Sequence, residues 1–181
     1  MNNNLMKTIN GAALTILMLS VFTPIWVSAQ DNGIEVQKLE ELSNERKRQN
    51  IEGVWRTVVT PRICQTGDPI PNIPPIRGLF TFNQGGTMSE WGVGPGQTPA
   101  LRSPGHGLWG QTRGIRDYSF TFIHLRYDAS GAFLGAQKIS AILRLGASGN
   151  SFTTNSAIEI LDSNDNVIGV GCATAVGTRF E

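Results

Sequence analysis

The sequence predicts an all-β protein, an eight-stranded antiparallel up-and-down β-barrel with a short N-terminal helix. After Asn50, eight runs rich in β-branched and aromatic residues follow one another. Most are separated by short connections of glycine, asparagine and aspartate, which are typical of β-hairpins. No stretch after Asn50 has the apolar period of a helix, which argues against parallel βαβ units.

Residues 1–29 have the pattern of a signal peptide. Lys7 supplies the positive charge, an apolar run extends from Ile9 to Val27, and Val27-Ser28-Ala29 resembles a cleavage site. An uncleaved membrane anchor is the alternative, although polar residues and a proline interrupt the run. We expect cleavage, and therefore a secreted or periplasmic protein with no stable membrane insertion afterwards.

The remaining residues fit one domain of about 150 residues with a single core. We divide them into a helix or linker over 30–50 and a β-barrel domain over 51–181. Removal of Lys7 lowers the formal net charge from +1 to 0, and the other basic residues are scattered. The chain therefore lacks the basic patch of a nucleic-acid-binding protein.

The polar segment over 31–50 predicts a short amphipathic helix. Val36, Leu39 and Leu42 are at helical spacing, and they form a thin apolar stripe. Three roles for it are open: a frayed linker, a cap on one barrel end, or a contact with another chain.

The eight expected strands differ in length and in the loops that join them. They are Val54–Ile63, Gly78–Asn83, Thr87–Val93, Gly107–Thr112, Asp117–Tyr127, Ala132–Leu145, Ser151–Leu161 and Val167–Arg179. Two proline-rich connections, over 65–77 and 94–106, are longer than hairpin turns. Such loops are either lids and binding loops or simple covers for an open barrel end.

The two cysteines favour a closed barrel over a sandwich. Cys64 ends the first expected strand and Cys172 lies in the last, and an exported chain permits a disulfide between them. A disulfide needs Cα atoms within about 7 Å, which makes these strands neighbours. Antiparallel register then brings Trp55 near Arg179, where the guanidinium can stack on the indole. Two buried free thiols are the alternative.

These residues resemble a known family. Gly53-Val54-Trp55 at the start of the first strand, with Arg179 after the last, resembles the signature of lipocalins and the wider calycin superfamily. The segment "GLFTFNQGGTMSE" over 78–90 is similar to the second and third strands of bacterial lipocalin-like domains. More narrowly, "RSPGHGLW" and "GCATAVGTRFE" resemble a group of secreted bacterial proteins without a characterised activity. The resemblance implies a barrel whose tryptophan packs across its floor beneath the arginine.

One face of the fifth expected strand is the candidate ligand-binding surface. Tyr118, Phe120, Phe122 and His124 share it, with Arg126 beyond. The opposite face is also half apolar, so alternation alone does not say which face is inside. A structural histidine is the simpler interpretation of His124, and haem binding through it is the alternative. We expect no cofactor and no metal.

Three residues are weak catalytic candidates, namely Glu90, His106 and Glu159. A carboxylate desolvated inside a barrel could act as an acid or base. The simpler interpretations are solvent-facing strand positions for the glutamates and a tight turn at His106. The sequence has no G-x-S-x-G motif and no spacing typical of a hydrolase triad.

Three functions fit these observations. The first is a secreted lipocalin-like protein that binds a small hydrophobic ligand inside the barrel. The second is a barrel isomerase or cyclase of the allene oxide cyclase or dirigent type, which would use Glu90, His106, Tyr118 and Glu159. The third is a structural barrel with a filled interior, with a homo-oligomer built on its exposed strand faces.

Overall fold

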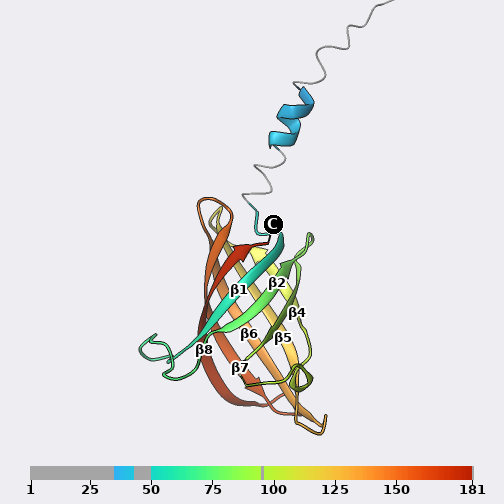
Figure 1. Cartoon of the computed structure of the whole chain (residues 1–181), viewed down its shortest axis with the longest axis vertical. Helices are drawn as coiled ribbons and strands as arrows, with labels where there is room; N and C mark the ends of the chain where they lie inside the picture. The colour runs from blue at the N-terminus through green and yellow to red at the C-terminus, as the bar shows by residue number, and fades with distance from the viewer. Residues whose placement is uncertain (1–34, 43–49, 95, 181) are drawn as a thin grey trace, which may run out of the picture.

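The computed structural model describes residues 35–42, 50–94 and 96–180. The expected signal peptide over 1–29 lies outside the described residues. The predicted architecture is confirmed: eight strands form one closed, entirely antiparallel barrel in which each strand pairs with its neighbours in the sequence (Figure 1). β1 and β8 pair to close it.

The strand bounds agree closely with the sequence prediction. The strands are β1 (Gly53–Arg62), β2 (Ile76–Phe82), β3 (Thr87–Val93), β4 (Gly105–Gln111), β5 (Asp117–Tyr127), β6 (Phe133–Leu145), β7 (Ser151–Leu161) and β8 (Val167–Arg179). β2 and β4 each begin two residues earlier than expected. Ile76 pairs with Val59 and Gly105 pairs with Glu90, so ladder pairing extends both strands into Pro/Gly-rich sequence.

A helix is present within the segment predicted for it. Residues 35–42 are helical, while 31–34 and 43–49 lie outside the described residues. Val36, Leu39 and Leu42 are all exposed, so the stripe does not pack on a barrel end. In the described part of the chain, no helix combines the length and apolar character needed to cross a membrane.

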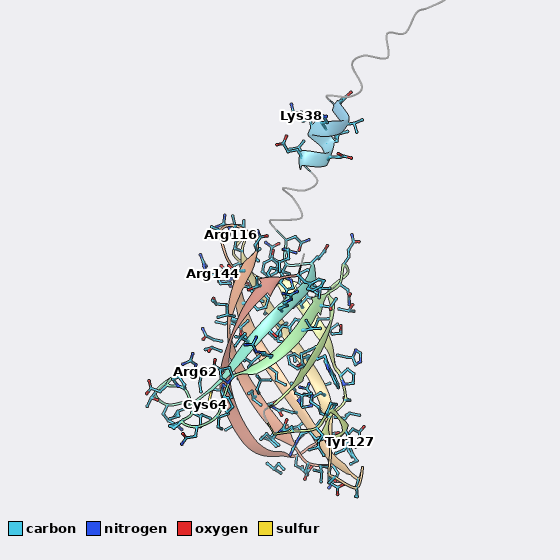
Figure 2. The ribbon with its side chains drawn as sticks, viewed as in Figure 1. Lys38, Arg62, Cys64, Arg116, Tyr127 and Arg144 are labelled. Atoms are coloured by element: carbon cyan, nitrogen blue, oxygen red, sulfur yellow. A yellow bond between two sulfur atoms is a disulfide. The ribbon has the colours of Figure 1, made fainter. Side chains whose placement is uncertain are left out.

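A disulfide joins the first and last strands from outside. Cys64 and Cys172 are bonded, with a Cα–Cα distance of 5.2 Å. The neighbouring residue Arg62 pairs with Cys172 across the β1–β8 ladder. Because β8 buries Ala173 and Ala175, its even-numbered residues, Cys172 among them, point to the outer wall. The bond therefore holds the start of the proline-rich connection against the outside of the barrel (Figure 2).

Burial identifies the inner face of each strand. Trp55 and Thr57 on β1 are buried, as are Tyr118, Phe120, Phe122 and His124 on β5. The face of β5 that sequence alternation could not assign is therefore the interior one. Ile123 and Leu125, from its opposite face, are exposed.

One end of the barrel is closed by Trp55 and Arg179, which are direct register partners. The Arg179 guanidinium carbon lies 4.3 Å from the centroid of the indole. Arg179 also donates to the carbonyls of Asn50 at 2.6 Å, Glu52 at 2.7 Å and Gly149 at 3.0 Å. One side chain thus joins the segment before β1, the end of β8 and the β6–β7 turn.

We predict that Arg179→Met lowers the free energy of unfolding by about 2–4 kcal/mol, because several charge-assisted hydrogen bonds and the cation–π contact are lost together. The free energy of unfolding of Arg179→Lys should lie between those of the wild type and Arg179→Met, because an ammonium group keeps the charge but lacks the planar guanidinium. Urea unfolding followed by tryptophan fluorescence measures both. The matched control is Arg144→Met, which removes an arginine that is 73% exposed and should change stability by less than about 1 kcal/mol. Equal effects of Arg179→Met and Arg144→Met would contradict the role of Arg179.

Candidate functional site

The interior of the barrel is filled at one end and hollow toward the other. Near Trp55 the aromatic side chains pack closely, with the Trp55 and Phe152 ring centroids 4.9 Å apart. Phe152 lies over Gly177, where an added Cβ would approach its ring to 2.3 Å. Further back along β8 the inward positions are Gly171, Ala173 and Ala175, which project little into the barrel. A cavity of about 600 Å³ remains beside them.

The cavity wall is mainly apolar, with a few polar groups toward the end where β3 and β5 finish. Its aromatic side is formed by Phe80, Phe120 and Phe122, and its aliphatic side includes Val59, Ile139 and Ile158. Polar residues in the wall are Arg62, Gln65, Glu90, Arg102, His124, Gln137, Thr154 and Ser156. An apolar chamber with a few convergent polar groups is the usual form of a small-molecule site.

The strongest electrostatic feature of the cavity is a buried ion pair. Both terminal nitrogens of Arg102 donate to the Glu90 carboxylate, and Arg102 Nη1 also donates to the Gly92 carbonyl at 2.5 Å. Burial raises the pKa of Glu90, while the charge and hydrogen bonds of Arg102 act in the opposite direction. Arg102 comes from the β3–β4 connection, so the pair ties this loop to the barrel wall.

Glycines make room for the ion pair. Gly105 on β4 is the register partner of Glu90, and an added Cβ there would lie 2.8 Å from Glu90 Oε2 and 2.8 Å from the Phe122 ring. At Gly92 an added Cβ would lie 3.2 Å from Glu90 Oε1. The carboxylate is therefore held between backbone segments that tolerate little side-chain volume.

His124 is a buried neutral base beside this pair. Only 6% of the residue is exposed. Burial lowers its pKa to about 4, and the positive charges of Arg102 and Arg126 add to the effect. At neutral pH the imidazole is uncharged and contributes a polar but neutral group to the cavity wall.

Three of the four predicted ligand-contacting residues meet in the cavity. Phe120, Phe122 and His124 line it. Tyr118 lies at the closed end instead, beside Trp109 and a separate hollow of about 640 Å³. The alternation along β5 places all four residues on the inner face. Tyr118 differs from the other three because it lies nearer the closed end of the barrel, away from the cavity.

The three weak catalytic candidates are dispersed. Glu90 is inside the barrel. His106 is an exposed residue of β4, so it is part of a strand and not of a tight turn. Glu159 points outward from β7 and pairs with Lys138 at 3.0 Å, with 43% of its side chain exposed. The acid and base geometry that the enzyme hypothesis needs is not assembled by these residues.

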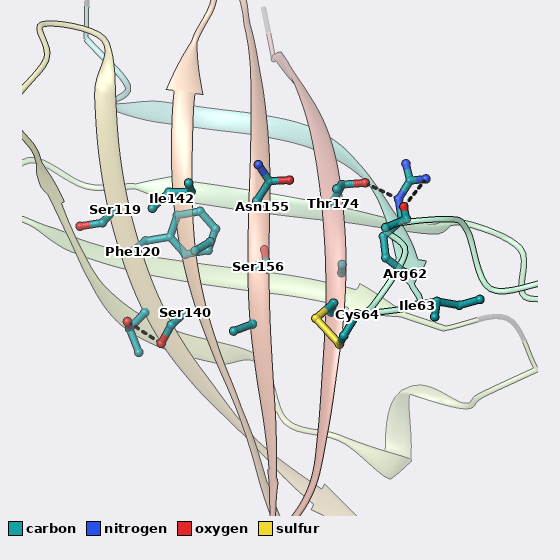
Figure 3. A pocket seen from close by; sticks show the side chains of 16 residues that line it. Arg62, Ile63, Cys64, Ser119, Phe120, Ser140, Ile142, Asn155, Ser156 and Thr174 are labelled. Carbon is teal, nitrogen blue, oxygen red and sulfur yellow. Dashed lines mark hydrogen bonds between the residues drawn. A yellow bond between two sulfur atoms is a disulfide. The ribbon is translucent and has the colours of Figure 1, made fainter.

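Another hollow, of about 660 Å³, lies on the outer wall beside the disulfide (Figure 3). Two hydrogen bonds join side chains of its lining, between Thr121 and Ser140 at 3.0 Å and between Arg62 Nε and Thr174 at 2.9 Å. Phe120 is the aromatic residue of its lining, and its lining includes no buried charged residue, so it is a weaker candidate site than the interior cavity, which three phenylalanines and the Glu90–Arg102 pair line.

Sequence reasoning missed Arg102. It lies in a segment of prolines and glycines, twelve residues after its partner Glu90, with no local pattern that relates the two. The length of the two proline-rich connections was the available signal, because it suggested binding loops. Both loops contribute to the cavity wall, through Arg102 from one and through Gln65 and Ile70 from the other. Most of the 65–75 segment is exposed.

Within the described residues, no three His, Cys, Asp or Glu side chains gather in a way that could hold a metal ion. No family model matches the sequence, and no curated protein matches it. The barrel topology is consistent with a calycin-like fold.

We predict that Gly105→Ala lowers the free energy of unfolding by about 1–3 kcal/mol, because the new methyl group displaces the Glu90 carboxylate or the Phe122 ring. The matched control is Gly110→Ala on the same strand, where an added Cβ meets nothing within 4 Å. That change should be neutral or stabilising by up to about 1 kcal/mol. Chemical denaturation of the two variants compares them. Equal stability would contradict the tight fit around Glu90.

We predict that stability falls on acidification because of His124. Its pKa is about 4 in the folded chain and near the ordinary 6.5 in the unfolded chain, so between these values only the unfolded chain takes up the proton. Between pH 7 and pH 5, the wild type should therefore lose about 2 kcal/mol more than His124→Gln. The raised pKa of Glu90 has the opposite effect on the pH dependence of stability, but this effect is common to the wild type and His124→Gln.

Urea unfolding at the two pH values tests this prediction. His106→Gln is the matched control, since it removes the exposed histidine of the outer wall. Parallel pH dependence in wild type and His124→Gln would show that His124 is not the responsible group.

Proposed function

We propose that this protein binds a small hydrophobic molecule inside its barrel, in the manner of a lipocalin-like carrier. The cavity carries the proposal. Its volume of about 600 Å³ lies within the range of about 300–1,000 Å³ that is usual for small-molecule sites. Its wall of phenylalanine, isoleucine and alanine side chains favours an apolar occupant through the hydrophobic effect.

The same cavity argues against a filled, purely structural barrel. β8 contributes Gly171, Ala173 and Ala175 to the cavity wall, where larger residues would close the space. An enzyme finds less support, because Glu90 is engaged by Arg102 while His106 and Glu159 lie on the outer wall.

We also propose that the protein acts outside the cytoplasm. The Cys64–Cys172 disulfide supports this, since such bonds persist in oxidising compartments. The signal-peptide pattern of residues 1–29 supports it from the sequence. Mass spectrometry of the exported protein would test cleavage, with Gln30 expected as the new N-terminus.

We predict that N-phenyl-1-naphthylamine, an uncharged apolar fluorophore, binds in the cavity with a blue-shifted, enhanced emission. Ala173→Phe should weaken its binding at least about tenfold, because a ring at this inward position fills space that the probe needs. The matched control is Val176→Phe, which adds a ring at an exposed position of the same strand and should leave binding within about twofold.

Fluorescence titration gives both affinities, and circular dichroism checks that each variant is folded. Absence of saturable binding, or equal affinities for Ala173→Phe and Val176→Phe, would refute the proposal. Native mass spectrometry of protein isolated from its own host would then identify the natural occupant as a retained mass.

A further inference from the structure

Two arginines and a histidine gather near the polar part of the cavity. Arg102 and His124 line the wall. Arg126 lies beside the lining residues: it follows His124 by two residues in the same inward-facing series of β5, and its charge contributes to the lowered pKa of His124. The backbones of Arg102 and Arg126 are paired by an isolated antiparallel bridge. The two guanidinium groups therefore originate from adjacent points of the barrel wall.

The cluster carries more positive than negative charge. Glu90 is its carboxylate, and that carboxylate is already bound by both terminal nitrogens of Arg102. The other ion pairs of the described residues, Lys138–Glu159 and Arg144–Asp117, are elsewhere on the barrel. Among the residues that the structure describes, Arg126 therefore has no anionic partner. The lowered pKa of His124, due first to burial and then to the nearby arginines, reflects the same positive field.

Arg126 also has an unsatisfied donor. Its Nη1 atom is buried, and no hydrogen-bond partner lies within reach among the described residues. Buried polar groups in native proteins are nearly always paired, and an unpaired charged donor is especially unfavourable. Because a cavity lies beside this cluster, an anionic group of a ligand could accept a hydrogen bond from this donor.

We propose that the ligand is amphipathic, with an apolar body in the cavity and an anionic group, such as a carboxylate, sulfonate or phosphate, bound by Arg126. This inference rests on the proposed function and adds the chemical class of the ligand. Arg102 keeps Glu90 neutralised, so that the carboxylate does not repel the incoming anion. His124, neutral at physiological pH, contributes a hydrogen-bonding group beside it.

A pair of matched fluorophores tests the charge requirement. 8-Anilinonaphthalene-1-sulfonate has the ring skeleton of N-phenyl-1-naphthylamine with one sulfonate added. We expect the sulfonate to bind the wild type more tightly than the uncharged probe. Arg126→Met should weaken sulfonate binding about tenfold or more, as expected for loss of a charge-assisted hydrogen bond, and leave the uncharged probe within about twofold.

Two further variants control the experiment. Arg126→Lys keeps the charge and should retain part of the preference for the sulfonate. Arg144→Met removes an exposed arginine of the outer wall and should change neither affinity. Because the uncharged probe is measured in every variant, its binding also reports whether the cavity is intact in Arg126→Met.

The outcomes separate this inference from the proposed function. If the uncharged probe binds and responds to Ala173→Phe while the sulfonate shows no dependence on Arg126, the anionic ligand class is wrong and the carrier function stands. If neither probe responds to Ala173→Phe, the cavity is not the binding site and both proposals fail. A sulfonate preference lost in Arg126→Met and partly kept in Arg126→Lys supports both.

Discussion

The contact between Arg179 and Trp55 decides where the barrel is closed and therefore where it can be open. The guanidinium covers the indole and binds the carbonyls of Asn50, Glu52 and Gly149, so this side chain of β8 holds together the segment before β1 and the β6–β7 turn. The indole nitrogen in turn donates to the Ile51 carbonyl at 2.7 Å. These contacts close one end, and the interior cavity lies toward the other, where the two long connections contribute to its wall.

Side-chain size along β8 then distributes the interior volume. At the closed end, Gly177 leaves space that the Phe152 ring occupies, and the aromatic cluster is continuous from there to Phe80 and Phe120. Further from the closed end, Ala173 and Ala175 lie in the wall of the interior cavity. Small residues of one strand therefore have two different effects: Gly177 accommodates a ring, whereas Ala173 and Ala175 border the cavity.

Much of the fold could be predicted from the sequence, because strand periodicity and turn residues are local signals. The bounds of β3, β5, β7 and β8 were predicted to the residue, and the Cys64–Cys172 pair indicated the strand order at closure. The inner face of β5 could not be predicted, since both of its faces carry apolar residues and only closure of the sheet distinguishes them. Arg102 was missed for a related reason: its contact with Glu90 depends on the path of a proline-rich loop, which has no periodicity to interpret.

The placement of charge inside the barrel follows from the same geometry. A buried Glu–Arg pair contributes little net stability, because desolvation offsets much of the attraction. Its place in the half of the barrel that holds the cavity, with Gly92 of its own strand and Gly105 of β4 against the carboxylate, is better explained by what it does for neighbouring groups. It anchors the β3–β4 connection to the wall and neutralises the carboxylate nearest the cavity. Among the described residues, Arg126 then remains the member of the cluster whose buried Nη1 has no hydrogen-bond partner, next to Arg102 in the backbone pairing.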